Sequence, residues 1–103
     1  MSEVPSAPPP AQMSVRLHIP VAARFRAIAS ALAGKFADAA GCAGEDARSL
    51  GPALDRTVAD VIALQGAGEA DSLDIEFNKG DGRVQVTIAC GRHHAKVTRP
   101  LPR

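Results

Sequence analysis

The sequence predicts an α+β domain, a two-layer sandwich in which two helices cover one face of a three-stranded sheet; a short fourth strand is left open. Three observations predict this fold. Two segments that alternate apolar and polar residues follow one another around a glycine-containing turn, and a third such segment lies near the start of the chain. Between them lie two stretches with helical apolar spacing. The predicted order is therefore strand, helix, helix, strand, strand.

The first predicted strand covers SVRLHI, where Val15, Leu17 and Ile19 alternate with polar residues, and it should end at Pro20. A helix follows, in which apolar residues recur every three or four positions and form one stripe. This helix should stop near Gly41, because glycine readily takes the conformation that ends a helix. The stripe consists of Val21, Phe25, Ile28, Leu32 and Phe36.

The second predicted helix starts at Pro52, because proline in a first helical turn loses no hydrogen bond. An earlier start near Glu45 is the alternative, and it would require a kink at Pro52. The helix should end within residues 66–68, which read GAG. Its apolar face consists of Leu54, Val58 and Val61, with Leu64 as a further candidate.

The last two predicted strands, SLDIEFN (72–78) and RVQVTIAC (83–90), form a hairpin joined by the turn sequence KGDG. The domain should span residues 13–92. Residues 93–103 contain basic residues and no acid, and we expect a mostly flexible tail with a short strand at 95–98 as the alternative. Residues 1–12 contain four prolines among small residues, which predicts a disordered leader.

The composition limits the classes of function. Hydrophobic residues make up 46% of the chain, but it has only three Phe and no Trp or Tyr, so the predicted core is thin. A second copy that covers apolar surface would stabilise such a domain, which makes a homodimer a candidate. A formal charge of +1 argues against a nucleic-acid partner, and no apolar run is long enough for a transmembrane helix. Two cysteines without a CxxC pair, and no secretory signal, favour a cytoplasmic protein.

The segments VRLHIP, AGEDARSLGPALDRTVADVIAL and DGRVQVTIACG, in this order, resemble the anti-sigma-factor serine kinases of bacteria. These kinases belong to the histidine-kinase-like ATPase superfamily, whose nucleotide site is called the Bergerat fold. The resemblance covers about residues 14–91. It implies a glutamate on the second helix as general base, an asparagine oxygen that binds Mg²⁺, and an aspartate in an Asp-x-Gly box that accepts a hydrogen bond from adenine.

The matching residues of this chain do not carry that chemistry. The general-base position is Arg56, whose guanidinium stays protonated and cannot accept a proton. Asp60 stands at the metal position, but Arg56 one turn away would compete with Mg²⁺ for its carboxylate, and a surface pair of the two is the structural alternative. Asp55 and Thr57 match the other positions of the box.

The adenine-binding position is matched by Cys90, whose thiol is a weak acceptor, and no glycine-rich lid follows it in the sequence. The resemblance therefore implies a lost ATP site, with no catalytic residue and no cofactor. His93 and His94 are weak metal candidates, because neighbouring side chains of an extended chain point to opposite sides. No metal site is expected.

The leading hypothesis is a non-catalytic regulatory domain that binds a protein: a sigma factor, an anti-sigma antagonist or another copy of itself. Two alternatives stay open: a divergent Mg-ATP-binding serine kinase that uses Asp55 or Asp60, and an unrelated small α+β interaction module. No membrane partner is expected. The candidate partner-binding residues are Arg16, His18, Arg24 and Lys35.

Overall fold

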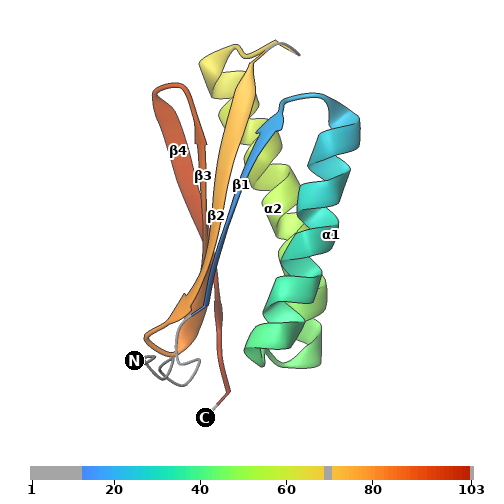
Figure 1. Cartoon of the computed structure of the whole chain (residues 1–103), viewed down its shortest axis with the longest axis vertical. Coiled ribbons are helices and arrows are strands. Elements are labelled where there is room, and N and C mark those ends of the chain that lie inside the picture. Colours follow the sequence, from blue (N-terminus) through green and yellow to red (C-terminus); the bar gives the residue numbers. More distant parts are fainter. Residues whose placement is uncertain (1–12, 69–70, 103) are drawn as a thin grey trace, which may run out of the picture.

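A computed structural model describes residues 13–68 and 71–102, and the statements below concern these residues (Figure 1). The predicted leader at 1–12 lies outside them. The elements are β1 (Met13–Pro20), α1 (Ala23–Ala40), α2 (Gly44–Gln65), β2 (Ser72–Gly80), β3 (Arg83–Cys90) and β4 (His93–Pro100). The protein is thus an α+β domain with two helices and a four-stranded antiparallel sheet.

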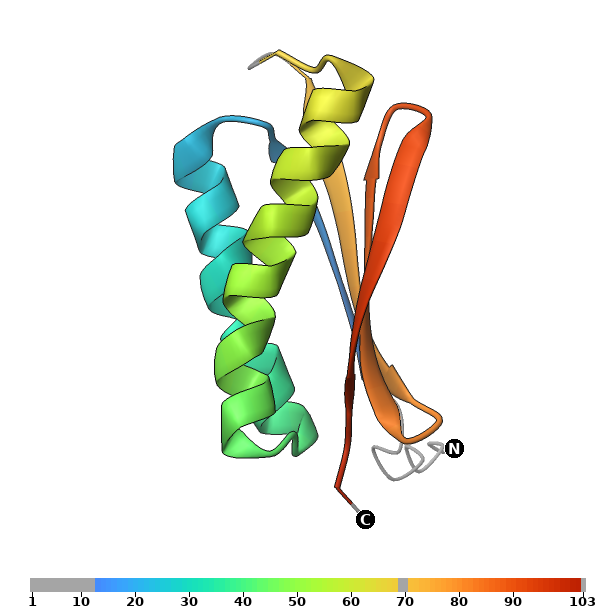
Figure 2. The ribbon, with the colours of Figure 1, turned by 180° about the vertical axis from the view of Figure 1, so that it is seen from behind.

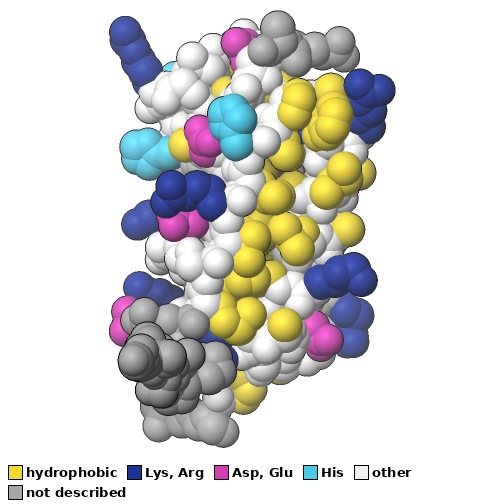
Figure 3. All heavy atoms as spheres, in the orientation of Figure 1, with side chains coloured by type: hydrophobic (Ala, Val, Ile, Leu, Met, Phe, Trp, Pro, Cys, Tyr) yellow, Lys and Arg dark blue, Asp and Glu magenta, His cyan; other side chains and the backbone are white. Residues whose placement is uncertain are grey.

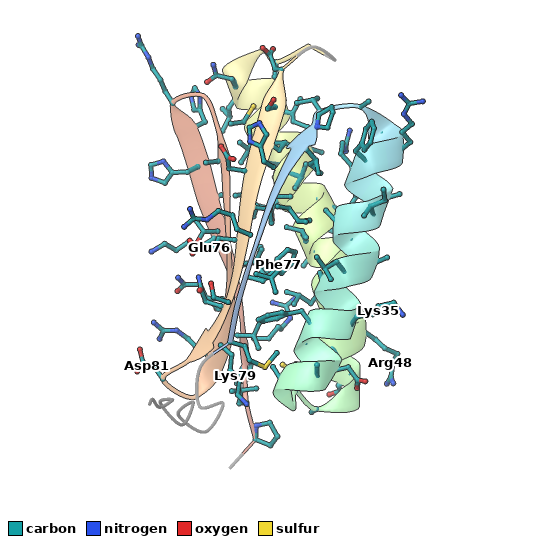
Figure 4. All side chains as sticks on the ribbon, viewed as in Figure 1. Lys35, Arg48, Glu76, Phe77, Lys79 and Asp81 are labelled. Carbon is teal, nitrogen blue, oxygen red and sulfur yellow. The ribbon has the colours of Figure 1, made fainter. Side chains whose placement is uncertain are left out.

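The strands lie in the order β1-β2-β3-β4, and both helices lie on the same face of the sheet (Figures 1 and 2). Figure 4 shows the alternation along β2: Phe77 points towards the helices and Glu76 points to the opposite face. The predicted hairpin is confirmed, with Asp81 and Gly82 in its turn. Both have positive φ, 54° and 74°, as the tight turn between twisted strands requires.

The segment expected to be mostly a flexible tail is instead the strand β4, longer than the alternative at 95–98. It pairs with β3 along its whole length, after a turn in which Gly91 takes a φ of 61°. Val97 anchors it to the core, and the Leu101 N–H extends the contact by donating to the Gly82 carbonyl at 2.9 Å. The sequence signal was weak because Ala95 and Val97 are the only apolar residues of the strand.

Helix α2 begins at Gly44, so the prediction of a start at Pro52 was wrong and Pro52 lies inside the helix. Gly51 precedes the proline and has no Cβ to collide with its ring, which lowers the cost of helical geometry there. Glu45 and Asp46 lie in the first turn, where carboxylates interact favourably with the helix dipole. Both predicted helix ends are confirmed, because Gly41 and Gly66 are left-handed C-caps.

The core lies between the sheet and the helices. The residues of β2 and β3 that face the helices are almost fully buried, and Phe77 packs against Phe36 of α1 with ring centroids 5.6 Å apart. On α1, however, the most buried residues besides Phe36 are alanines, at positions 29, 33, 37 and 40. The two ends of the predicted stripe, Val21 and Phe36, are buried in the core, whereas Ile28 in its middle is 56% exposed.

The two helices lie close together at Gly51. A Cβ added to Gly51 would lie 2.9 Å from the carbonyl oxygen of Ser30 on α1. Glycine is therefore required by the space between the two backbones. The two helices pack mainly on each other. Against the sheet, α2 packs on β4 and β3, whereas α1 packs less extensively on β1 and β2. The β1 side of the sandwich is the less covered side.

Candidate functional site

The positions that match the catalytic box lie in the middle of α2, on its exposed surface. Asp55, Arg56 and Asp60 are all exposed, and Thr57 directs its hydroxyl to the Ala53 carbonyl of its own helix at 2.9 Å. Asp55 and Asp60 are five residues apart, which separates them by about 140° around a helix that turns about 100° per residue. The two carboxylates therefore point to different sides of α2 and do not form one site.

Asp55 belongs to the side of α2 that faces α1. Its carboxylate lies 3.8 Å from the guanidinium of Arg26 on α1, and this contact is the closest ion pair of either residue among the described side chains. The predicted pair of Arg56 with Asp60 does not form: although both residues are described, no ion pair within 4.0 Å joins them. The contact of Arg26 with Asp55 could not be predicted from the sequence pattern, because the two residues lie on different helices.

A groove of about 660 Å³ runs along the outer side of the two helices, between α1 and α2. Its charged lining residues are Arg26, Arg48 and Asp55, and the rest of the lining consists of alanine, glycine, serine and proline. Arg56, Asp60 and Cys90 do not line it. The groove therefore does not gather the positions that the resemblance assigns to the nucleotide and its metal ion.

Cys90 is buried at the end of β3, and Gly91, which follows it, is exposed but lies against a side chain from the end of α2. The side chain of Gln65, at the end of α2, occupies the space where a Cβ on Gly91 would lie. The Gln65 Oε1 atom accepts a hydrogen bond from the Arg92 backbone N–H at 3.2 Å and contacts the His93 Nδ1 atom at 2.8 Å. The role of Gln65 was not predicted, because its position in the sequence does not indicate that its side chain contacts the β3–β4 turn.

Neither thiol is activated. Burial, reinforced by the nearby Asp46 carboxylate, raises the pKa of Cys42 from its ordinary value of 9.0. Burial, reinforced by Asp71, raises the pKa of Cys90 from the same value. A nucleophilic cysteine requires the opposite shift, because the thiolate is the reactive form.

These shifts predict a loss of stability at alkaline pH. A pKa that is higher in the folded state favours the folded state fully below about pH 9, and this contribution disappears as the pH rises through the raised pKa. The free energy of unfolding, measured with urea, should therefore fall as the pH rises above about 9. The Cys42→Ala/Cys90→Ala double variant keeps every lysine and should show a smaller fall; an equal fall would contradict the prediction.

The four candidate partner-binding residues do not share one surface. Arg16 and His18 lie on the open face of the sheet, where they pair with Glu76 at 3.2 Å and with Asp74 at 2.7 Å. Arg24 and Lys35 lie on α1, and Figure 4 shows Lys35 pointing away from the sheet. The edge of the sandwich formed by β1 and α1 separates the two pairs.

His93 and His94 point to opposite sides of β4, as predicted for neighbours on a strand. His93 is half-buried against Gln65, and His94 is exposed. Within residues 13–68 and 71–102, no group of three His, Cys, Asp or Glu side chains is arranged to hold a metal ion. Neither described helix is long and apolar enough to cross a membrane.

A scan of protein-family models finds none that matches the chain, and a search of curated proteins finds no match.

Proposed function

We propose that this chain is a non-catalytic, protein-binding regulatory domain of the kind that the resemblance to anti-sigma-factor kinases implies, with its ATP site lost. The observation that carries the proposal is the state of the catalytic box on α2. Arg56 is exposed at the position of the proton acceptor, and the carboxylates of Asp55 and Asp60 diverge on either side of it. A base and a metal ligand must instead converge on one phosphate.

The adenine end of the expected site supports the same conclusion. Cys90 is 2% exposed, its thiol is held protonated by burial, and Gln65 packs over the following glycine. A nucleotide base would have to displace Gln65 and break its hydrogen bond to Arg92. The β1 strand does join the sheet of the hairpin, which is the arrangement that the resemblance requires and an unrelated module would not need.

The proposed partner is a protein of the sigma-factor system: a sigma factor, an anti-sigma antagonist or a second copy of this chain. Protein binding is favoured because the described surface combines exposed apolar side chains on β1 and α1 with basic residues of α1 nearby. Specific protein interfaces place such apolar contacts at the centre and charges at the rim.

Mg-ATP is expected to leave the melting temperature of the purified chain unchanged at millimolar nucleotide. A divergent Mg-ATP-binding kinase, the alternative function, would be stabilised by about 2.7 kcal/mol at a nucleotide concentration 100 times its Kd. The melting temperature is measured from thermal unfolding curves with and without Mg-ATP. The Arg56→Ala variant is measured in the same way as a matched comparison. Stabilisation of the parent chain by Mg-ATP, but not by Mg²⁺ alone, would contradict the proposal.

Direct binding tests the protein partner. Purified sigma factors and anti-sigma antagonists of the source organism are titrated against the labelled chain, and saturable binding by one of them is expected. Charge reversal at Arg24 and Lys35 together should weaken that binding if α1 contributes to the rim of the interface. Absence of binding to every member, together with absence of self-association, would remove the proposed function.

A further inference from the structure

Strand β4 has a free backbone edge, because it is the last strand of the sheet and pairs only with β3. The Leu101 N–H donates to the Gly82 carbonyl at 2.9 Å, and this bond continues the β3–β4 register. The backbone groups of an antiparallel strand alternate in direction, so every second residue before Leu101 also bonds to β3. The residues between them turn their N–H and C=O groups to the free edge. They are His94, Lys96 and Thr98.

The charges on the open face of the sheet are paired where that face is formed by β1 and β2. Arg16 and His18 lie directly opposite Glu76 and Asp74 in the β1–β2 register and pair with them. At the left of Figure 3, acidic side chains lie next to basic ones and to histidines. Positive charge is therefore compensated on this part of the face.

Strand β4 carries positive charge without such partners. Lys96 lies opposite Thr87 in the β3–β4 register, so no carboxylate faces it. Arg92 is exposed in the turn before β4, and Arg83 is exposed opposite Pro100 at the other end of the strand. Among the side chains that the structure describes, no carboxylate lies within 4.0 Å of any of these three cations. The open face along β4 is thus positively charged and uncompensated.

On the helix side, the free edge of β4 is bordered by α2 (Figure 2). The Arg99 Nε donates to the Ser49 hydroxyl at 2.9 Å, and this contact identifies the side of α2 that borders β4. Helical spacing places Ala53, Thr57 and Leu64 on the same side. The first two are small and half-buried, whereas Leu64 is 68% exposed. This side of α2 therefore leaves room for further side chains and offers them an apolar contact.

We propose that β4 binds an extended acidic segment of a partner protein, which adds a further strand to the sheet. Alternate side chains of an added strand point to opposite faces. Acidic ones on the open face would lie beside Lys96, between Arg92 and Arg83, and apolar ones on the helix side would cover Leu64. The backbone groups at the edge would supply the hydrogen bonds of the added strand. This site is separate from the β1 and α1 surface on which the proposed function relies.

The charges of β4 select against other occupants of the edge. A second copy of β4 would place Lys96 against like charges. The leader at residues 1–12 contains one acid, Glu3, and its prolines lack the N–H groups that a strand ladder needs. A nucleic-acid backbone would meet the carboxylates of Asp74 and Glu76 on the same face, where the described residues include no aromatic side chain to stack on a base.

The acetylated and amidated peptide EVEVEVE tests the site. Titrated in fluorescently labelled form against the full chain at low salt, it should bind saturably. The peptides KVKVKVK, with the opposite charge, and EEEEVVV, with the same composition but no alternation, should bind about tenfold more weakly or less. Absence of saturable binding by EVEVEVE would overturn the proposal. Equal binding of EEEEVVV would also overturn it, because charge alone would then account for the attraction.

Two variants separate the charge of β4 from its backbone edge. Lys96→Glu should raise the Kd of EVEVEVE about tenfold. Lys35→Glu is the matched control, because it makes the same charge change at an exposed lysine of α1, and it should leave the Kd unchanged. Thr98→Pro removes one N–H from the free edge without changing the charge, and it should raise the Kd about threefold or more. Circular dichroism verifies that each variant is folded, and equal losses for Lys35→Glu and Lys96→Glu would contradict the proposal.

Hydrogen exchange locates the peptide on the unmodified chain. Amides of His94, Lys96 and Thr98 should exchange more slowly when EVEVEVE is bound, whereas those of residues 14–19 on β1 should not change. Protection of β1 instead of β4 would overturn the proposal.

Three further outcomes would assign the edge to another occupant and would equally remove the acidic segment. Tighter binding of single-stranded oligothymidylate than of EVEVEVE would indicate nucleic acid. A dimer of the parent chain that EVEVEVE dissociates would indicate a second copy. Peptide binding only after deletion of residues 1–12 would indicate the leader. None of these outcomes bears on the proposed function, whose own test is the charge reversal at Arg24 and Lys35.

Discussion

Replacing Phe77 with alanine is expected to remove a large part of the stability of the domain. Phe77 is fully buried on β2 and packs against Phe36, and the chain has only three phenylalanines and no other aromatic residue. Truncation of a buried phenylalanine costs about 3–5 kcal/mol, and a domain of this size has a net stability of about 5–15 kcal/mol. No larger side chain nearby can fill the space, because the inward residues of α1 are mostly alanine.

Urea unfolding followed by circular dichroism measures the effect. The Leu64→Ala variant is the control, since this side chain is 68% exposed and its truncation should change the free energy of unfolding by no more than about 0.5 kcal/mol. If Phe77→Ala unfolds within 1 kcal/mol of the parent, then the centre of the core does not depend on the Phe36–Phe77 contact.

Replacing Gly51 with alanine is expected to lower the melting temperature, although alanine is the better helix former. The added Cβ would lie 2.9 Å from the Ser30 carbonyl oxygen and 3.1 Å from its hydroxyl oxygen. The hydroxyl can rotate away, but the carbonyl belongs to the backbone of α1, so the helices must move apart. Overpacking of this kind costs about 1–3 kcal/mol, and the higher helix propensity of alanine offsets about 1 kcal/mol of it.

Gly34→Ala provides the matched control within the same helix pair. Its added Cβ would lie 3.8 Å from the Ala47 carbonyl oxygen, which is an ordinary contact. This variant should therefore gain helix propensity and melt at the same temperature as the parent or higher. Each kcal/mol should shift the melting temperature by about 4–8 °C in a domain of this size. Equal melting temperatures for the two variants would contradict the close approach at Gly51.

Local patterns predicted the parts of the fold that local forces determine. The hairpin follows from alternation on both sides of an Asp-Gly turn, and the helix ends follow from Gly41 and Gly66. The start of α2 was misplaced because Pro52 favours a helix start in isolation, whereas the packed Gly51 beside it lets the helix continue. Strand β4 was underestimated because its pairing with β3, more than its own composition, holds it in place.

The sequence predicted that the residues of the candidate site are exposed, but it did not predict which residues they contact. The exposure of Asp55, Arg56 and Asp60 on α2 follows from helical periodicity. The contact of Asp55 with Arg26, and the cover that Gln65 forms over the β3–β4 turn, join residues far apart in the chain. The exposure of Val15 and Ile28 was not predictable for a related reason: the sequence shows which residues are apolar, but alanines occupy most of the buried positions of α1.

The place of β1 in the chain has a consequence for how the protein is made. Strands β2, β3 and β4 are joined by tight turns, so each can pair with the preceding strand as soon as it is synthesised. Strand β1 can pair with β2 only after both helices and β2 have been synthesised. Of these four strands, β1 therefore stays unpaired for the longest time during synthesis. On a polysome, neighbouring nascent chains could pair through their unpaired β1 strands. The rate of translation through residues 21–80 therefore sets how long each nascent chain is exposed to such intermolecular pairing.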